Sequence, residues 1–215
     1  MRGRAVITGA DGGMGSEITK AVAQAGYEVI MLCSSLEAGT IRRNQIAQET
    51  GNQDMQVRQV DLSIMSSVMA VADGLLADGK PIALLMNNAG TMCSHFKQTP
   101  DGLEYTVAVN YVAPYLLSRK LLPLMQADSR IVCMVSCTYA IGQITPEFFT
   151  RGKKGEFWRI PIYSNTKLAL WLFVRKLALE VASRGIWVGA SEAAVKAGLK
   201  IPVHIKFDTG MCRVG

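Results

Sequence analysis

The stretch Thr8–Gly15, with the sequence TGADGGMG, follows the short apolar segment Arg4–Thr8 and leads into a segment with helical periodicity, Gly15–Ala25. Glycine lacks a Cβ, so this loop can turn tightly and let a phosphate approach the backbone. The first N–H groups of the next helix are unpaired and favour an anion. Glycine-rich turns are common, so the loop alone is weak evidence. At the start of a strand–helix–strand unit it predicts a nucleotide site, with S-adenosylmethionine methyltransferases as an alternative class. The candidate residues are Gly9, Asp11, Gly12, Gly13, Met14 and Gly15.

Apolar runs alternate with helical segments along the rest of the chain, and no internal repeat interrupts them. We expect strands at Arg4–Thr8, Tyr27–Cys33, Met55–Val60, Ile82–Met86, Arg130–Ser136 and Gly185–Val188. We expect helices at Gly15–Ala25, Leu36–Glu49, 63–77 with Ser63 as N-cap, 103–125 with a kink at Pro114, and Tyr163–Ser183. This alternation predicts an α/β fold: a doubly wound, mostly parallel, Rossmann-like sheet between two helical layers, as a single domain over residues 1–215. Ligands of such sheets bind at the carboxyl ends of the strands.

Composition excludes several classes of protein. The 215 residues are 49% apolar and 19% charged, which excludes a disordered chain. The longest apolar run, Leu168–Val174, is too short for a membrane span, and the first residues do not resemble a signal peptide. Five cysteines without a C-x-x-C pair, and two histidines, predict no metal site, no disulfide framework and a cytoplasmic location. The net charge of +6 is scattered, so we expect no nucleic-acid partner.

Two further motifs occur at strand and helix positions. Asn87–Gly90 (NNAG) follows the fourth expected strand, and Tyr163–Lys167 (YSNTK) opens the last expected helix. Together with the T-G-x-x-x-G-x-G spacing of the first loop, they make the chain resemble the short-chain dehydrogenase/reductase family up to about residue 188. Asn110 and Ser136 stand where that family keeps its other two catalytic residues. The long interval between Ser136 and Tyr163 resembles the retinol-dehydrogenase-like and protochlorophyllide-reductase-like branches.

The YSNTK motif carries the expected chemistry. Tyr163 and Lys167 are four residues apart, so on a helix they share one face. Tyrosine hydroxyls ordinarily titrate near pH ~10, and a neighbouring ammonium favours the phenolate, which suits acid–base catalysis. The resemblance implies proton transfer by Tyr163, nicotinamide-ribose binding by Lys167, a substrate hydrogen bond from Ser136, and a water held by Asn110. A bare Y-x-x-x-K pair is more often a pair on a helix surface. The active-site interpretation therefore depends on the order and spacing of all the motifs together.

The resemblance also implies cofactor contacts beyond the first loop. Asp61 and Leu62, after the third strand, would lie near the adenine, although an aspartate there can also cap the next helix. The four residues of the NNAG motif would border the adenosine ribose and support the sheet, although asparagines are also common in turns. This group comprises Asn87, Asn88, Ala89 and Gly90.

The choice of nicotinamide depends on the end of the second strand. Leu32–Ser35 contains no acidic residue to bind a ribose 2′-hydroxyl. The similar branch often carries arginine where Ser34 stands, and Asp11 replaces a commoner asparagine and disfavours further negative charge. Arg42 and Arg43 are near enough in sequence to reach a phosphate, but a solvent-facing position is the simpler interpretation. On balance NADP(H) is favoured slightly over NAD(H).

The last expected helix is apolar around most of its circumference, through Ala169–Val174 and Leu177–Leu179. Such a helix is buried on more than one side. One side faces the sheet, and the other is expected to meet a second subunit, because the family forms homodimers and homotetramers. Burial under a local segment is the alternative.

The C-terminal end departs from the family pattern. Gly189–Gly198 resembles the helix that normally follows a substrate-covering lid, and Pro202–Phe207 would be the last strand. We therefore expect the lid to be missing near Val188–Gly189.

The leading interpretation is an NAD(P)-dependent oxidoreductase that moves a hydride between nicotinamide and a small carbonyl or secondary alcohol. The aromatic residues Phe148, Phe149, Phe157 and Trp158 suit an apolar substrate, or else pack their loop down. Cys93, His95 and Tyr139 are further candidates for the substrate border. A non-catalytic nucleotide-binding regulator on the same fold is the alternative, favoured by the missing lid. A methyltransferase has no use for the tyrosine and lysine.

Overall fold

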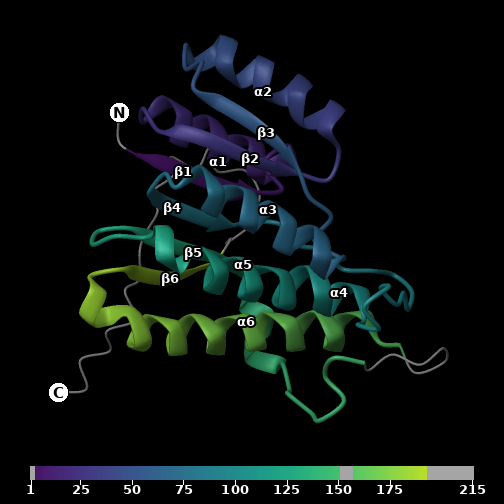
Figure 1. Cartoon of the computed structure of the whole chain (residues 1–215). Coiled ribbons are helices and arrows are strands. Elements are labelled where there is room, and N and C mark those ends of the chain that lie inside the picture. Colours follow the sequence, from purple (N-terminus) through teal and green to yellow (C-terminus); the bar gives the residue numbers. More distant parts are fainter. Residues whose placement is uncertain (1–2, 151–156, 193–215) are drawn as a thin grey trace.

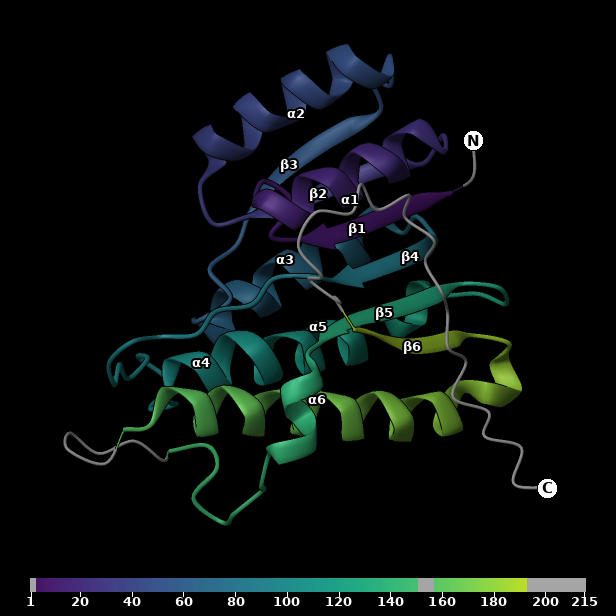
Figure 2. The same ribbon diagram turned by 180° about the vertical axis from the view of Figure 1, so that it is seen from behind.

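The computed structural model describes residues 3–150 and 157–192. Its centre is a six-stranded sheet in the order β3-β2-β1-β4-β5-β6, in which every neighbouring pair is parallel (Figures 1 and 2). The strands are β1 (Arg4–Thr8), β2 (Glu28–Cys33), β3 (Met55–Gln59), β4 (Ile82–Asn87), β5 (Arg130–Val135) and β6 (Trp187–Glu192). The predicted doubly wound parallel sheet is therefore confirmed.

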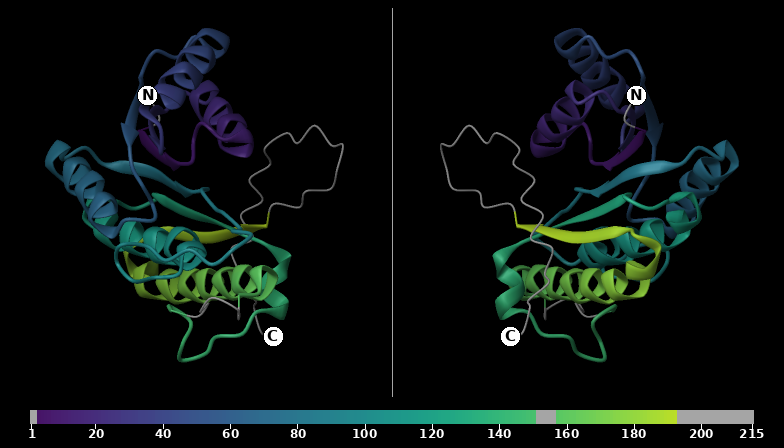
Figure 3. Two further views of the ribbon diagram at one scale, coloured as in Figure 1. Left: turned by 90° about the vertical axis from the view of Figure 1, so that its right-hand side faces the viewer. Right: turned by 90° about the vertical axis from the view of Figure 1, so that its left-hand side faces the viewer.

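Helices cover both faces of the sheet, which gives the three predicted layers (Figure 3). The first face packs against α1 (Gly13–Gln24) and α2 (Leu36–Thr50). The second packs against α3 (Met65–Asp78), α5 (Ala113–Leu121) and α6 (Arg159–Val181). Shorter elements are α4 (Tyr105–Val107), a π-helical turn η1 (Ala108–Val112), and the 3-10 turns η2 (Leu122–Leu124), η3 (Cys137–Ile141) and η4 (Ala182–Arg184). Within the described ranges, no helix is long and apolar enough to cross a membrane.

Strand residues point alternately to the two helical layers, and both sets are apolar. Val6 and Ile30 belong to the core under α3, α5 and α6, whereas Ile7 and Met31 belong to the core under α1 and α2. All four are fully buried. Continuous apolar strands follow because a parallel sheet is covered on both faces.

Several boundaries differ from the sequence expectation; α6, for example, begins at Arg159, four residues before its expected start at Tyr163. The first turn of α3 is capped by Asp101, whose carboxylate accepts from the Met65 N–H at 2.9 Å, so Ser63 is not the N-cap. The irregularity expected at Pro114 is instead the π-helical turn η1 just before it. Gly189–Glu192 is strand, not helix, because these residues continue the pairing of β6 with β5 as far as Val135. The remainder of that expected helix, and the expected strand at 202–207, lie outside the described residues.

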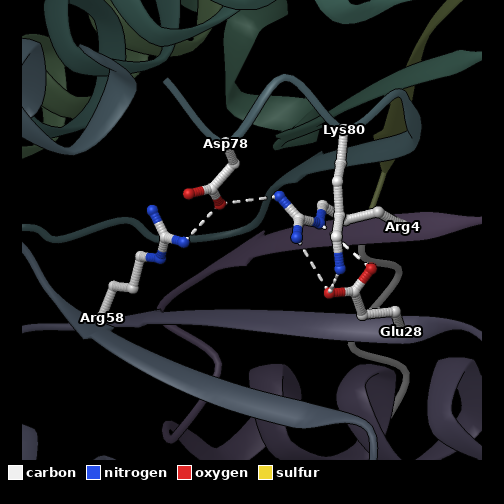
Figure 4. A network of polar contacts seen from close by, with 5 residues as sticks. All are labelled: Arg4, Glu28, Arg58, Asp78 and Lys80. Carbon is white, nitrogen blue, oxygen red and sulfur yellow. Dashed lines mark hydrogen bonds and ion pairs between the residues drawn. The ribbon is translucent and has the colours of Figure 1, made fainter. Parts of the chain in front are cut away.

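A charged network joins Arg4 and Glu28, the first residues of β1 and β2, to side chains of β3 and of the end of α3 (Figure 4). Arg4 opens β1 and is 3% exposed. Its guanidinium donates to both carboxylate oxygens of Glu28, at 2.9 and 3.2 Å, and to Asp78 at 2.9 Å. Lys80 forms an ion pair with Glu28, and Arg58 forms one with Asp78. The hydrogen bond from Arg4 lowers the pKa of Glu28. Burial raises the pKa of Asp78, but hydrogen bonds from Arg4 and Arg58 outweigh it and lower that pKa overall.

We expect Arg4→Met to lower the free energy of unfolding by about 3 kcal/mol, because it leaves a half-buried pair of carboxylates short of its central cation. In the wild type both carboxyls have lower pKa values folded than unfolded, so their stabilisation is present at neutral pH. It is lost as the pH falls below ~4 towards the folded values. Urea titrations at pH 7 and at acidic pH measure both effects.

Lys20→Met is the matched control, since Lys20 forms an exposed ion pair with Glu49 and its loss has little effect. An Arg4→Met protein with wild-type stability at pH 7 would show that the network contributes nothing.

Candidate active site

The glycine-rich loop makes one close backbone approach. Gly9 has φ +60°, and a Cβ added to Gly15 would lie 1.9 Å from the Gly9 carbonyl oxygen. The loop is closed by the Gly12 N–H, which donates to the same oxygen at 3.2 Å. Only a residue without a side chain fits at Gly15, so the first turn of α1 lies directly against the end of β1.

The amino end of α1 is open to an anion. Gly12 is the N-cap, no side chain caps the helix, and its first turn contains no acidic residue. Gly12 and Gly13 are exposed, and Met14 is 50% exposed. The unpaired N–H groups of a helix start favour negative charge, so this cradle fits the pyrophosphate of a dinucleotide.

Residues at the ends of β1 and β4 are tied together where the strand order reverses. The Thr8 hydroxyl accepts from the N–H groups of Asn88 and Ala89, both at 3.0 Å. The Asn88 amide donates back to the carbonyl oxygens of Thr8 and Gly9, at 3.1 and 3.3 Å. In open parallel sheets the ligand crevice lies at this reversal. These bonds therefore fix the position of the glycine-rich loop relative to the NNAG turn.

Asn87 differs from the rest of that turn, because it is 3% exposed and faces the interior. Its side-chain amide donates to the Ser118 hydroxyl at 3.0 Å and to the Cys133 sulfur at 3.4 Å. It therefore supports the sheet, whereas Gly90 is exposed at the crevice.

Tyr163 and Lys167 lie on one face of α6, as their spacing predicts. The Lys167 Nζ is 5.5 Å from the centre of the Tyr163 ring. Lys167 is 4% exposed and donates to the Met134 carbonyl on β5 at 2.8 Å. Burial lowers the pKa of Lys167 to about 8, so the side chain is mostly charged at neutral pH. Tyr163 itself is half-exposed, which leaves its ring accessible from the crevice.

Asn110 lies in the π-helical turn η1. Its amide nitrogen donates to the Thr91 carbonyl at 2.8 Å and to the Thr166 hydroxyl at 3.2 Å, and its oxygen accepts from the Thr91 N–H at 2.8 Å. Pro114 has no N–H to donate to the Asn110 carbonyl four residues earlier, which favours the wider turn. A Cβ on Gly90 would lie 3.5 Å from both the Asn110 oxygen and the Lys167 Nζ. The NNAG turn, the π turn and α6 therefore converge.

Ser136 follows β5 and caps the 3-10 turn η3, where its hydroxyl accepts from the N–H and hydroxyl of Thr138 at 3.3 and 3.1 Å. The segment after it packs tightly on α6: a Cβ on Gly142 would lie 2.6 Å from the Ser164 carbonyl oxygen. Ser136 is half-exposed, so its hydroxyl remains available at the carboxyl edge of β5.

At the end of β2 the polar groups are few. Ser34 is exposed, and burial raises the pKa of Cys33 to about 12, with the nearby Asp11 carboxylate adding to the shift. Arg43 does not reach this end, because its guanidinium donates to the Met55 carbonyl at the start of β3, at 3.1 Å. Arg42 is exposed.

The remaining predicted cofactor contact, Asp61, is exposed beside the half-buried Leu62. Its carboxylate accepts from the N–H and hydroxyl of Ser63, at 2.8 and 2.6 Å. It orders the turn before α3 and faces solvent, but it does not cap that helix, whose N-cap is Ile64, so the capping interpretation is wrong.

Sequence reasoning missed three threonines that hold the site together. Thr8 joins the two loops, and Thr91 and Thr166 fix the Asn110 side chain. Thr8 stands inside the quoted TGADGGMG stretch, so its hydroxyl could have been recognised as a hydrogen-bonding group of the site. Thr91 follows NNAG directly, but nothing in its sequence context predicts a bond to Asn110.

Of the aromatic residues expected to line a substrate pocket, Phe148 and Phe157 pack against neighbouring rings, whereas Trp158 is exposed. Phe148 is 5% exposed and its ring lies 5.6 Å from that of Tyr111. Phe157 contacts Phe96 edge-on at 6.4 Å, and Trp158 is 71% exposed.

Comparison with protein families matches residues 4–196 to the model described as short chain dehydrogenase. The chain belongs to the short-chain dehydrogenase family. The chain is 36% identical over 184 residues to human retinol dehydrogenase 11, covering 84% of this chain and 57% of that protein. It is 32% identical over 189 residues to human dehydrogenase/reductase SDR family member 13, covering 86% and 50%. The chain thus spans little more than half the length of these curated relatives.

Solved structures agree with the fold. An uncharacterised protein of Mycobacterium paratuberculosis superposes with a TM-score of 0.78 at 28% identity, over 91% of this chain and 69% of that one. A short-chain dehydrogenase of Sphingobium yanoikuyae in complex with NADPH gives a TM-score of 0.69 at 25% identity, over 87% and 69%. The identity to the curated relatives, and not the solved structures, places the chain with the retinol-dehydrogenase-like branch that the motifs indicated.

Proposed function

We propose that this dehydrogenase transfers a hydride between NADP(H) and a small, apolar carbonyl or secondary alcohol. The observation that carries the proposal is the convergence of Tyr163, Lys167 and Asn110 beside an anion cradle at the reversal of the sheet. A phosphate loop alone would suit many nucleotide proteins. A buried lysine beside a half-exposed tyrosine suits proton transfer, and simple nucleotide binding does not require the tyrosine hydroxyl.

Each residue has a separate task in carbonyl reduction. NADPH, when bound, supplies the hydride. Tyr163 donates its hydroxyl proton to the carbonyl oxygen, and the hydroxyl of Ser136 hydrogen-bonds to that oxygen and orients the substrate. The Lys167 ammonium stabilises the phenolate left on Tyr163 and is close enough to the crevice to hold a ribose hydroxyl. Asn110, whose side chain is fixed by Thr91 and Thr166, supports the water that links Lys167 to a proton relay.

Turnover distinguishes this proposal from a nucleotide-binding regulator on the same fold. The protein is mixed with NADPH and a panel of ketones, aldehydes and quinones, and NADPH consumption is followed. Consumption that depends on the carbonyl compound supports the enzyme. Tight NADPH binding with no turnover on any member of the panel supports the regulator.

We expect a several-fold higher kcat/KM with NADPH than with NADH. Ser34 leaves the end of β2 without the carboxylate that would reject a 2′-phosphate, although Asp11 nearby reduces the preference. Ser34→Asp should reverse the preference, because it places a negative charge where the 2′-phosphate would lie. Steady-state kinetics with both cofactors measure this.

The control for that charge is Ser66→Asp, an exposed position on α3. A clear preference of the wild type for NADH would contradict the assignment.

Pairing of two copies through α6 also remains part of the proposal. Leu172 and Leu179 are 46% and 81% exposed on this helix, and the family pairs it between subunits. We also propose a cytoplasmic location, as the cysteine usage predicts. Sizing chromatography that shows only a monomer at micromolar concentration would contradict the dimer.

A further inference from the structure

Thr166 lies between Tyr163 and Lys167 on α6, and its side chain is fully buried. Its hydroxyl takes part in two hydrogen bonds. It donates to the Tyr163 carbonyl, three residues earlier, at 2.6 Å, and it accepts from the Asn110 side-chain amide at 3.2 Å. A single hydroxyl therefore connects the backbone of the tyrosine to the side chain of an asparagine that is 56 positions from Thr166 in the sequence.

The direction of both bonds is fixed by the chemistry of the groups. A carbonyl oxygen only accepts, so the one proton of the Thr166 hydroxyl goes to Tyr163. The same hydroxyl can then only accept from Asn110, and the amide must present its nitrogen to α6. With the amide reversed, two oxygens would face each other and neither would donate.

The other side of the Asn110 amide is held by Thr91. The amide nitrogen donates to the Thr91 carbonyl and the amide oxygen accepts from the Thr91 N–H, both at 2.8 Å. Both N–H donors of the amide are thus used, and Asn110 is buried. Thr91 directly follows the NNAG turn, and η1 lies between α4 and α5 beside α6 (Figures 1 and 2). This one amide therefore joins the NNAG turn, the π turn and α6.

The amide oxygen and the lysine ammonium lie beside the same glycine. Asn110 Oδ1 and Lys167 Nζ are each 3.5 Å from the position that a Cβ on Gly90 would occupy. The ammonium donates one of its three protons to the Met134 carbonyl at 2.8 Å. In the proposed reaction a water supported by Asn110 links Lys167 to the proton relay. The relay therefore depends on the orientation of this amide.

We propose that Thr166 is a positioning residue of the proton-transfer step. Its hydroxyl holds the Asn110 amide in the orientation that the relay water requires, and it ties the Tyr163 backbone to the π turn. Because its side chain is fully buried, it acts through these two neighbours and not on the substrate itself. The inference rests on the proposed function and names a residue whose loss slows the proton step without weakening substrate binding.

Thr166→Val is the main test, because it removes the hydroxyl and leaves one N–H of the buried Asn110 amide without an acceptor. We expect kcat to fall about tenfold for decanal, or for whichever ketone or quinone of the panel the wild type reduces faster. The KM of the carbonyl compound and the Kd of NADPH should stay within about twofold, since no group that binds either is altered. The solvent deuterium isotope effect on kcat should rise, because the proton step then limits turnover more strongly.

Thr166→Ser should restore kcat, since it keeps the hydroxyl and both hydrogen bonds. Ser164→Ala is the matched control on the same helix. Ser164 is also fully buried, and its hydroxyl has no hydrogen-bond partner among the described residues, so kcat should not change. If urea titration shows that Thr166→Val is unfolded, Thr166→Ala removes the same hydroxyl without placing a methyl group against the amide.

Solvent exchange of the Asn110 side-chain amide protons gives a second readout that needs no turnover. In protein labelled with ¹⁵N at asparagine, these protons should exchange slowly in the wild type and in Ser164→Ala. Exchange should be at least about tenfold faster in Thr166→Val, because a buried hydrogen bond is lost.

The proposal is overturned if Thr166→Val keeps both the kcat and the amide exchange of the wild type, or if Thr166→Ser is no more active than Thr166→Val. It is also overturned if the loss in Thr166→Val appears only in KM or in the Kd of NADPH. A wild type that turns over no carbonyl compound contradicts the proposed function and any catalytic role of Thr166 with it. Normal turnover of the wild type and of Thr166→Val contradicts this inference alone.

Discussion

Replacement of Tyr163 by phenylalanine is expected to reduce kcat by about 10²- to 10⁴-fold, the usual contribution of a positioned general acid. The ring remains in place on α6 and keeps its contact with Lys167, whose Nζ lies 5.5 Å from the ring centre. Only the hydroxyl is lost, so NADPH affinity should change little. Stopped-flow measurement of the hydride step and fluorescence titration of NADPH give the two quantities separately.

Tyr139→Phe is the control for this substitution. Tyr139 lies in η3 after Ser136, and its ring is stacked on Trp171 with centres 5.3 Å apart. Removing its hydroxyl should leave turnover nearly unchanged. Equal losses in the two variants, or full activity of Tyr163→Phe, would remove Tyr163 from the proton-transfer step.

The fold and the positions of the motifs were predictable from the sequence because both depend on local patterns. Alternating apolar and helical segments predict the parallel sheet, and the loop Thr8–Gly15 stands at the start of the first unit. The four-residue spacing of Tyr163 and Lys167 predicts their common face without any tertiary information.

The remaining features depend on contacts between distant segments. The Lys167 bond to the Met134 carbonyl joins residues that are 33 positions apart, and the fit of Gly90 against Asn110 depends on the π turn. A π turn has no clear sequence signal, and Pro114 indicated only that some irregularity was near. Burial of Phe148 against Tyr111 was equally invisible, because aromatic residues in a loop are typical of both a substrate pocket and packing.

Replacement of Gly15 by alanine is expected to destabilise the protein by about 3 kcal/mol or more, the upper end of the range for overpacking. The new Cβ would lie 1.9 Å from the Gly9 carbonyl oxygen and 2.9 Å from the Asn88 amide nitrogen. The first contact is with backbone, so no rotation of a side chain relieves it, and α1 must move away from β1. Because the same movement displaces the N–H groups that face the pyrophosphate, NADPH affinity should fall at least about 100-fold.

Gly13→Ala tests whether the loss of stability comes from the close approach at Gly15 and not from the replacement of any glycine in the loop. Gly13 is the first residue of α1, and a Cβ there would have no neighbour within 4 Å. It does not require a positive φ, so alanine should change the free energy of unfolding by less than about 1 kcal/mol. Chemical denaturation of the two variants without NADPH compares their stabilities directly. If the two variants lose stability equally, the loss comes from the reduced flexibility of the loop and not from the contact at Gly15. If only Gly15→Ala loses stability, the cause is the close contact at Gly15. There only a hydrogen atom leaves room for the start of α1 to pack against the end of β1.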